Sequence, residues 1–208
     1  LKLVLNEFFP NAEVKVEEDT MAAVFATINN PQEAAVVCIM GTGSNCSYYD
    51  GERLHQKIKS LGYTLMDDAS GNYYGKELIR DYYFNHMPEV IKVSFADKYN
   101  LDADYIKYNL YKQPNPNAYL AQFAEFMILN KDSEYIRELI KRGFRRFANN
   151  MIMQFKEELK TVPVHFAGSI SFFCQDEIKQ VAEEMGFTVG NFERRPIEGL
   201  VSFHTDAT

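Results

Sequence analysis

The chain of 208 residues is 46% hydrophobic and 25% charged, which provides enough apolar material for a buried core in one large domain or two small ones. Its formal net charge of -7 argues against a nucleic-acid partner, because an acidic surface repels phosphate backbones. Three cysteines without a CxxC pair argue against a disulfide framework or a zinc site, and since no apolar run approaches the roughly 20 residues of a membrane helix, we expect a soluble, cytoplasmic protein.

The first part of the chain predicts a helix, a strand and a second helix. Residues 1–9 repeat apolar side chains at the spacing of one helical face, and residues 12–17 alternate as a strand does. Asp19-Thr20 can cap the short helix that follows. The turn at 29–31 marks a domain boundary, because a buried strand begins near residue 34. Since the sequence opens within a helical pattern, we expect upstream sequence to be missing.

That buried strand runs into the glycine-rich turn Gly41-Thr42-Gly43-Ser44-Asn45-Cys46. Glycine allows a close backbone approach, so successive N–H groups can point at phosphate oxygens while Thr42 and Ser44 add hydroxyl donors. The turn is neither a Walker nor a Rossmann motif, and such turns also serve ordinary hairpins. Asp50-Gly51 then predicts a second hairpin with a two-residue type I′ turn.

The middle of the chain is predicted to be helical. The apolar segment 61–71 ends in Asp67-Asp68, just before a helix expected at 74–86. Because a helix N-terminus stabilises anions, we expect Asp68 or Ser70 either to cap this helix or to take part in the reaction. Residues 88–160 read as further helices, with breaks at 113–116 and 131–132 and an amphipathic final helix that runs from 136 to 155.

The last part of the chain predicts a βαβ unit. A buried strand at 162–167, a glycine turn at 168–171, a helix at 175–185 and a strand at 187–189 follow one another. Gly168-Ser169 can place backbone N–H groups against a nucleotide. His165, on the first of these strands, is expected to be a hydrogen-bonded core histidine rather than a ligand.

Taken in order, these motifs resemble those of the N-acetylglucosamine kinase and BadF/BadG/BcrA/BcrD ATPase family, in the actin, hsp70 and hexokinase superfamily. Residues 41–46 match the family's second phosphate motif, and Asp19 matches its catalytic base. Asp67 matches the first acid of a Gly-Asp-Glu-Gly-Ser signature. Residues 166–170 match the adenosine motif, and residues 197–200 resemble the closing glycine helix.

The resemblance implies an α/β fold, the actin-like ATPase (ribonuclease H-like) C-terminal domain with a mixed sheet, flanking helices and a helical insertion at about 88–160. Residues 1–33 would then be a remnant of the N-terminal domain, and 34–208 the C-terminal domain. The family's first phosphate motif is absent, together with most of the first domain. We therefore expect this chain alone to be nearly inactive, because the missing part supplies half of the phosphate clamp.

The resemblance further implies an ATP-dependent kinase that phosphorylates N-acetylglucosamine or a related amino sugar at the 6-hydroxyl, with Mg²⁺ and as a homodimer. Asp19 would be the catalytic base, and no protein residue is predicted to ligate a metal. The sugar would be bound by Ser44, Asn45, Gly62 and Asp67, and ATP by Gly41, Thr42, Gly43, Gly168 and Ser169.

Three substitutions leave the identity of the sugar open. Met66 and Ala69 stand in place of glycines of the acid signature, and Leu61 stands where the family's nearer members have tryptophan. Two other functions also remain open. One is an ATPase that activates a dehydratase by electron transfer, although its iron–sulfur cluster requires cysteines in contexts that this sequence lacks. The other is a non-catalytic sugar-binding or nucleotide-binding relative.

Overall fold

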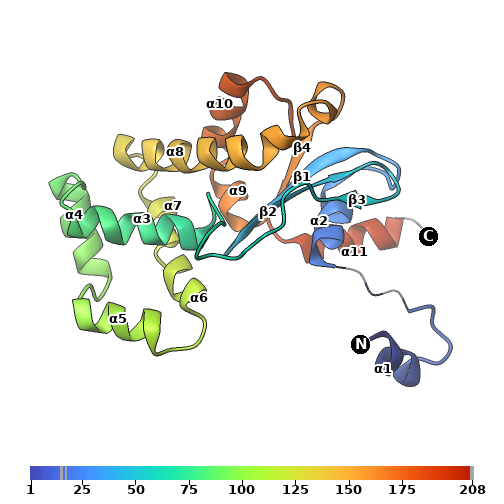
Figure 1. Ribbon diagram of the computed structural model, residues 1–208, viewed down its shortest axis with the longest axis horizontal. Helices are drawn as coiled ribbons and strands as arrows, with labels where there is room; N and C mark the ends of the chain where they lie inside the picture. Colours follow the sequence, from blue (N-terminus) through green and yellow to red (C-terminus); the bar gives the residue numbers. More distant parts are fainter. Residues whose placement is uncertain (15, 17, 207–208) are drawn as a thin grey trace.

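The computed structural model describes residues 1–14, 16 and 18–206, and a five-stranded mixed sheet forms its centre (Figure 1). The strand order is β3-β2-β1-β4-β5. Strand β1 pairs antiparallel with β2 and parallel with β4, β2 pairs antiparallel with β3, and β4 pairs parallel with β5. The strands are β1 (Ala35–Met40), β2 (Ser44–Tyr49), β3 (Leu54–His55), β4 (Val164–Ala167) and β5 (Val189–Glu193). The predicted α/β fold with a mixed sheet is confirmed.

Strand β1 lies at the middle of the sheet and is covered on both faces. Val36, Cys38 and Met40 belong to the larger core, whereas Ala35 and Val37 belong to a smaller core on the opposite face. A strand covered on both sides requires apolar residues at successive positions rather than alternation. This explains why the sequence shows a continuous apolar run directly before the glycine turn.

Helices cover the two faces of the sheet unequally. The smaller core lies under α2 (Asp19–Thr27), which also packs against α11 (Pro196–Asp206). The larger core is covered by α3 (Gly71–Tyr83), α8 (Glu134–Asn150) and α10 (Gln175–Met185). The remaining helices of this side are α4 (Glu89–Lys98), α5 (Ala103–Tyr111), α6 (Pro116–Ala121), α7 (Ala124–Leu129) and α9 (Ser169–Phe173), with 3-10 turns at Ile152–Phe155 and Glu158–Lys160. Figure 1 shows α4, α5 and α6 extending away from the sheet.

The N-terminal predictions are confirmed in part. Helix α1 (Lys2–Phe8) is present, and none of its residues is buried. The predicted strand at 12–17 is wrong for residues 12–14 and 16, which form no strand, while Lys15 and Glu17 lie outside the described residues. A strand needs a partner to satisfy its backbone groups, and local alternation of side chains cannot reveal whether a partner exists. The proposed cap is also wrong: Asp19 is the first helical residue, and Glu18 precedes it without a side-chain cap.

The β2–β3 hairpin differs from the prediction. Residues 50–53 connect the strands, and the Asp50 N–H donates to the Arg53 carbonyl at 3.1 Å. Gly51 has φ +100°, but Asp50 does not have a positive φ, so the turn is not type I′. The Asp50 carboxylate accepts the N–H groups of Glu52 and Arg53 at 2.8 and 2.7 Å, and this side-chain turn replaces the expected two-residue turn.

Several element boundaries after the hairpin are corrected. Helix α3 begins at Gly71 rather than 74, because Ser70 caps it by accepting the Tyr73 N–H. Helix α8 ends at Asn150, and a 3-10 turn continues to Phe155. The turn expected at 168–171 already contains the start of α9, and the last strand runs from Val189 to Glu193. The helix breaks at 113–116 and 131–132 are confirmed. Within the described part of the chain, the structure holds no helix long and apolar enough to cross a membrane.

Candidate functional site

A cavity of about 270 Å³ opens where strand β1 turns into strand β2. The turn itself consists of Gly41–Gly43, here called the glycine loop, because Met40 pairs with Ser44 across the two strands. The cavity collects most of the residues predicted from the sequence to form the site. Its lining comprises Asp19, Ile39, Gly41, Thr42, Gly43, Ser44, Asn45, Ser60 and Asp67.

The glycine loop is held from behind by the first turn of α3. The Gly71 N–H donates to the Gly41 carbonyl at 2.7 Å, and the Asn72 N–H donates to the Thr42 carbonyl at 3.1 Å. Within the loop, the Gly41 N–H donates to the Gly43 carbonyl at 3.0 Å. The loop carbonyls therefore satisfy N–H groups that a helix N-terminus would otherwise leave without an intrahelical partner.

Side-chain alternation along β2 sorts two neighbouring residues to opposite faces of the sheet. Ser44 lies on the face of the larger core, where its hydroxyl donates to the Asp68 carbonyl at 2.7 Å. Asn45 lies on the other face, which it shares with α2, and its Oδ1 accepts the Cys46 N–H at 2.8 Å. Because Asp19 begins α2, Asn45 and Asp19 line the same cavity.

Asp67 is a partly buried carboxylate beside the glycine loop. Its Oδ2 accepts a hydrogen bond from Asn72 Nδ2 at 3.3 Å, and Asn72 Nδ2 also donates to the Thr42 carbonyl at 2.6 Å. Burial raises the pKa of Asp67, and the hydrogen bonds from Asn72 and the Ser44 N–H oppose that rise. A Cβ atom at Gly43 would lie only 2.7 Å from Asp67 Oδ2, so glycine is needed there for the carboxylate to reach this position.

Asp68, which the sequence left as a cap or a reactive group, is neither a cap nor a lining residue of this cavity. Its Oδ1 lies 3.0 Å from Arg146 Nε, and its Oδ2 accepts a hydrogen bond from Asn150 Nδ2 at 3.0 Å. Both partners project from α8, so Asp68 ties the acid signature to that helix. The sequence alone did not predict either of these contacts.

A second cavity of about 250 Å³ adjoins the first and shares Ser44, Ser60 and Asp67 with it. Its other lining residues mix apolar side chains with polar ones. They are Ile58, Leu65, Met66, Asp68, Arg146, Asn150 and Met151. Two adjoining cavities with a shared wall can hold a ligand with a ring in one and a substituent in the other. The sequence reasoning missed Ser60 and this whole second cavity.

Three predicted residues lie outside both cavities as the structure describes them. Gly168 has φ +116°, and a Cβ there would lie 2.5 Å from the Met40 carbonyl oxygen, so the end of β4 packs directly behind the glycine loop. Ser169 is exposed at the start of α9. Gly62 is exposed in a turn with φ +81°, where its carbonyl accepts the Met66 N–H at 2.9 Å. The binding roles of these residues stay predictions.

Comparisons with known proteins extend the interpretation of the fold. No protein-family model and no curated protein matches the chain. A solved structure from Porphyromonas gingivalis, named "putative N-acetylglucosamine kinase", matches 99% of this chain and 71% of its own with 28% identity and TM-score 0.89. A protein of the same name from Chromobacterium violaceum matches 96% of this chain and 70% of its own, with 15% identity and TM-score 0.68. A ROK family glucokinase from Streptomyces griseus, solved with glucose and AMPPNP, matches 98% of this chain and 70% of its own, with 13% identity and TM-score 0.51. The resemblance drawn from the sequence is thereby confirmed: this is a sugar-kinase fold of the actin-like ATPase superfamily.

Proposed function

Since the chain has a sugar-kinase fold, we propose that it is part of an ATP-dependent kinase that phosphorylates the 6-hydroxyl of N-acetylglucosamine or a related amino sugar. The observation that carries the proposal is the first cavity. It brings a carboxylate on α2, a glycine loop, and the amide and carboxylate of Asn45 and Asp67 around one space of about 270 Å³. These are the groups that phosphoryl transfer to a carbohydrate requires.

The sugar side of the cavity is formed by Asn45 and Asp67. Amide and carboxylate groups pair with vicinal hydroxyls because they offer two polar atoms in one plane. Asp19 also lines the cavity, at the start of a helix packed on the sheet. A carboxylate in that position accepts the proton of the attacking hydroxyl, a contribution of about 10²- to 10⁴-fold for a positioned base.

The phosphate side of the cavity is formed by the glycine loop. A Cβ atom built at Gly41 would meet no heavy atom within 4 Å, so the backbone there faces open space that phosphate oxygens can occupy. Thr42 is exposed beside it and offers a hydroxyl donor. Phosphoryl transfer requires positioning and charge neutralisation rather than covalent chemistry by the protein. Mg²⁺ bound with ATP supplies that neutralisation.

Replacement of Asp19 with alanine tests the role of the base. In the full-length protein with Mg-ATP and a panel of hexoses, we expect sugar-dependent ADP release to fall by roughly 10²- to 10⁴-fold, with sugar affinity nearly unchanged. Glu18→Ala is the matched control, because Glu18 is an exposed neighbouring acid whose side chain makes no cap hydrogen bond. Unchanged turnover in Asp19→Ala, or ATP hydrolysis that does not depend on sugar, contradicts the kinase proposal.

The second cavity supports an amino sugar rather than a plain hexose. Ile58, Met66 and Met151 give it an apolar wall, while Asn150 supplies an amide near Asp68. An acetamido group has matching chemistry, with a methyl group for the apolar wall and a carbonyl that accepts a hydrogen bond. Met66, which replaces a signature glycine, places a side chain in this cavity and so bears on the size of the substituent.

Sugar discrimination provides a separate prediction. We expect Asn150→Ala to lower the ratio of kcat/KM for N-acetylglucosamine over glucose by roughly 10-fold, because an amide that pairs with a substrate group accounts for discrimination of this order. Asn149→Ala is the control, since Asn149 lies next in sequence and does not line either cavity. An unchanged ratio would show that the second cavity does not contact the substituent.

The dehydratase-activating alternative finds little support in the placement of the cysteines. Cys38, Cys46 and Cys174 are all buried, and Cys38 and Cys46 lie with their sulfurs 3.5 Å apart inside the sheet. A cluster held between two subunits needs thiolates at the surface. A turnover measurement distinguishes a kinase from the non-catalytic alternative, because a relative of that kind binds sugar or nucleotide but releases no ADP.

A further inference from the structure

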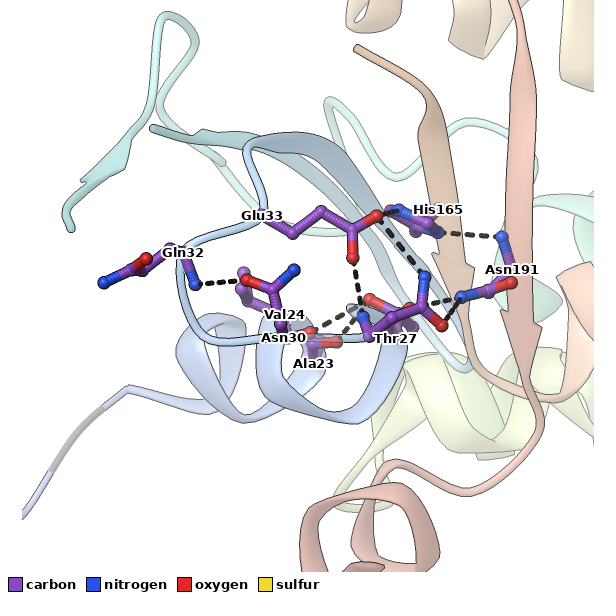
Figure 2. A network of polar contacts seen from close by, with 9 residues as sticks. Ala23, Val24, Thr27, Asn30, Gln32, Glu33, His165 and Asn191 are labelled. Atoms are coloured by element: carbon purple, nitrogen blue, oxygen red, sulfur yellow. Dashed lines mark hydrogen bonds and ion pairs between the residues drawn. The ribbon is translucent and has the colours of Figure 1, made fainter. Parts of the chain in front are cut away.

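A group of polar residues joins the C-terminal end of α2 to the sheet, on the face that α2 covers (Figure 2). We call this group the α2 clamp. It consists of Thr27 and Asn29 at the end of α2, Glu33 before β1, His165 on β4 and Asn191 on β5. None of these residues lines the first or the second cavity.

A β-bulge creates the acceptor site at the centre of the clamp. The pairing of β4 with β5 shifts between Val164 and Phe166, so two residues of β5 oppose His165. A bulge leaves a backbone group without its ladder partner and redirects side chains. Here the Asn191 N–H donates to His165 Nδ1 at 2.8 Å. A Cβ at Gly190 would lie 2.5 Å from the imidazole ring, so the glycine makes room for this contact.

From the bulge, the Asn191 side chain reaches the end of α2. Its Nδ2 donates to the Thr27 carbonyl at 2.8 Å and to Asn29 Oδ1 at 3.3 Å. The Asn29 N–H in turn donates to Glu33 Oε2 at 2.7 Å. These bonds satisfy backbone groups at and beyond the helix end, which lack intrahelical partners. The helix end is thus fixed to two parallel strands by directional contacts.

His165 is a buried member of the clamp, as the sequence led us to expect of a hydrogen-bonded core histidine, and only 2% of its side chain is exposed. Burial lowers the pKa of His165, and the Glu33 carboxylate opposes this. Because Nδ1 accepts a hydrogen bond, the neutral ring carries its proton on Nε2, 3.5 Å from Glu33 Oε1. Glu33 is the titratable group of the clamp that faces the ring, whereas its other members, Thr27, Asn29 and Asn191, do not titrate.

We propose that the α2 clamp positions Asp19: it fixes one end of a nine-residue helix and thereby sets the place of the carboxylate at the other end. At a rise of about 1.5 Å per residue, the two ends lie roughly 12 Å apart on one rigid element. The rest of the contact between α2 and the sheet is apolar and mixes small side chains, such as Ala23 and Ala35, with larger ones, such as Val24 and Ile28. Apolar packing is not directional, whereas the hydrogen bonds of the clamp specify which atoms of the helix end meet the strands. The role of Asp19 itself rests on the proposed function.

The test uses Asn191→Ala, His165→Leu and His165→Asn in the full-length protein. Asn191 is exposed, so its truncation leaves no core cavity. Asparagine at 165 can present Oδ1 where Nδ1 lies, whereas leucine cannot accept a hydrogen bond. Asn30→Ala is the control, because Asn30 Oδ1 accepts the Gln32 N–H in the adjoining turn and, among the described residues, makes no hydrogen bond to α2.

We expect Asn191→Ala and His165→Leu to speed hydrogen exchange of the α2 amides and to lower kcat by roughly 10-fold, with KM for the sugar within twofold of wild type. His165→Asn and Asn30→Ala should stay close to wild type in both readouts. In wild type, α2 protection should also fall as pH drops through the pKa of His165, because a protonated Nδ1 cannot accept the Asn191 N–H. His165→Asn should not show this pH dependence.

Unchanged exchange of α2 in Asn191→Ala and His165→Leu overturns the proposal, and so does faster exchange without a fall in kcat. If the wild type shows no sugar-dependent turnover at all, the proposed function fails. The clamp is then tested by amide hydrogen exchange alone, measured in Asn191→Ala and His165→Leu for α2 and for residues 41–43. Faster exchange at both places supports positioning of the α2 N-terminus against the loop. Faster exchange confined to residues 27–29 overturns it.

Discussion

Gly43→Ala is expected to weaken sugar binding by about 10- to 100-fold, since displacement of Asp67 removes charge-assisted hydrogen bonds worth roughly 1.5–3 kcal/mol. The reason is steric. A Cβ atom at Gly43 would lie 2.7 Å from Asp67 Oδ2 and 3.3 Å from Cγ, so the carboxylate has to move away from the cavity. The clashing atoms belong to the end of a side chain, and the fold itself should therefore be little affected. Calorimetric titration of the full-length protein with sugar, in the absence of nucleotide, measures the effect.

Gly41→Ala is the matched control for this prediction. Gly41 lies two residues earlier in the same loop, and an added Cβ there meets nothing within 4 Å. Sugar affinity without nucleotide should be the same as in wild type, and the thermal midpoint should stay within about 2 °C, as for other surface substitutions. Retention of wild-type sugar affinity by Gly43→Ala would show that Asp67 does not bind the sugar from this position.

Gly168→Ala is expected to give the largest loss of stability, about 3 kcal/mol or more in the free energy of unfolding. Two costs add at this position. The backbone has φ +116°, which side chains disfavour, and the added Cβ would lie 2.5 Å from the Met40 carbonyl oxygen, a backbone atom that cannot move without displacing β1. Equilibrium unfolding in urea measures the loss, and fluorescence of the 13 tyrosines gives the signal.

Gly186→Ala separates the two costs. Gly186 also has a positive φ, +76°, at the end of α10, but an added Cβ there meets nothing within 4 Å. Only the conformational cost applies, and the expected loss is about 1 kcal/mol. Equal losses for the two variants would mean that β4 does not press on the glycine loop as the structure shows.

The sequence predicted the central sheet and the first cavity well because their signals are local. The apolar run before Gly41 reflects burial on both faces, which composition reports directly. The gathering of Asp19, residues 41–45 and Asp67 followed from motif order and family resemblance, and the structure places them around one cavity. Their chemical roles remain predictions.

The parts that the sequence did not predict depend on pairs that are distant in sequence. Asp68 and Arg146 are 78 positions apart and meet only because α8 crosses the end of the acid signature. The bulge opposite His165 depends on the register of two strands, which alternation alone cannot specify. The strand expected at 12–17 is an error of a different kind. The side chains alternate as in a strand, but residues 12–14 and 16 pair with no other strand among the described residues. The hairpin after Tyr49 was mispredicted because the Asp50 side chain, rather than glycine conformation, sets its turn.

The attachment of the glycine loop to α3 means that the loop does not move as an independent hairpin tip. Its carbonyls at Gly41 and Thr42 are bonded to the first N–H groups of α3, and α3 in turn packs against α6, α7 and α8. Any reorientation of this helical region relative to the sheet must either carry the loop with it or break both bonds. The helical region is therefore mechanically connected to the place where phosphates would bind, although it lies outside that place. A partner that docks on these outlying helices would have a direct route for changing the geometry of the loop.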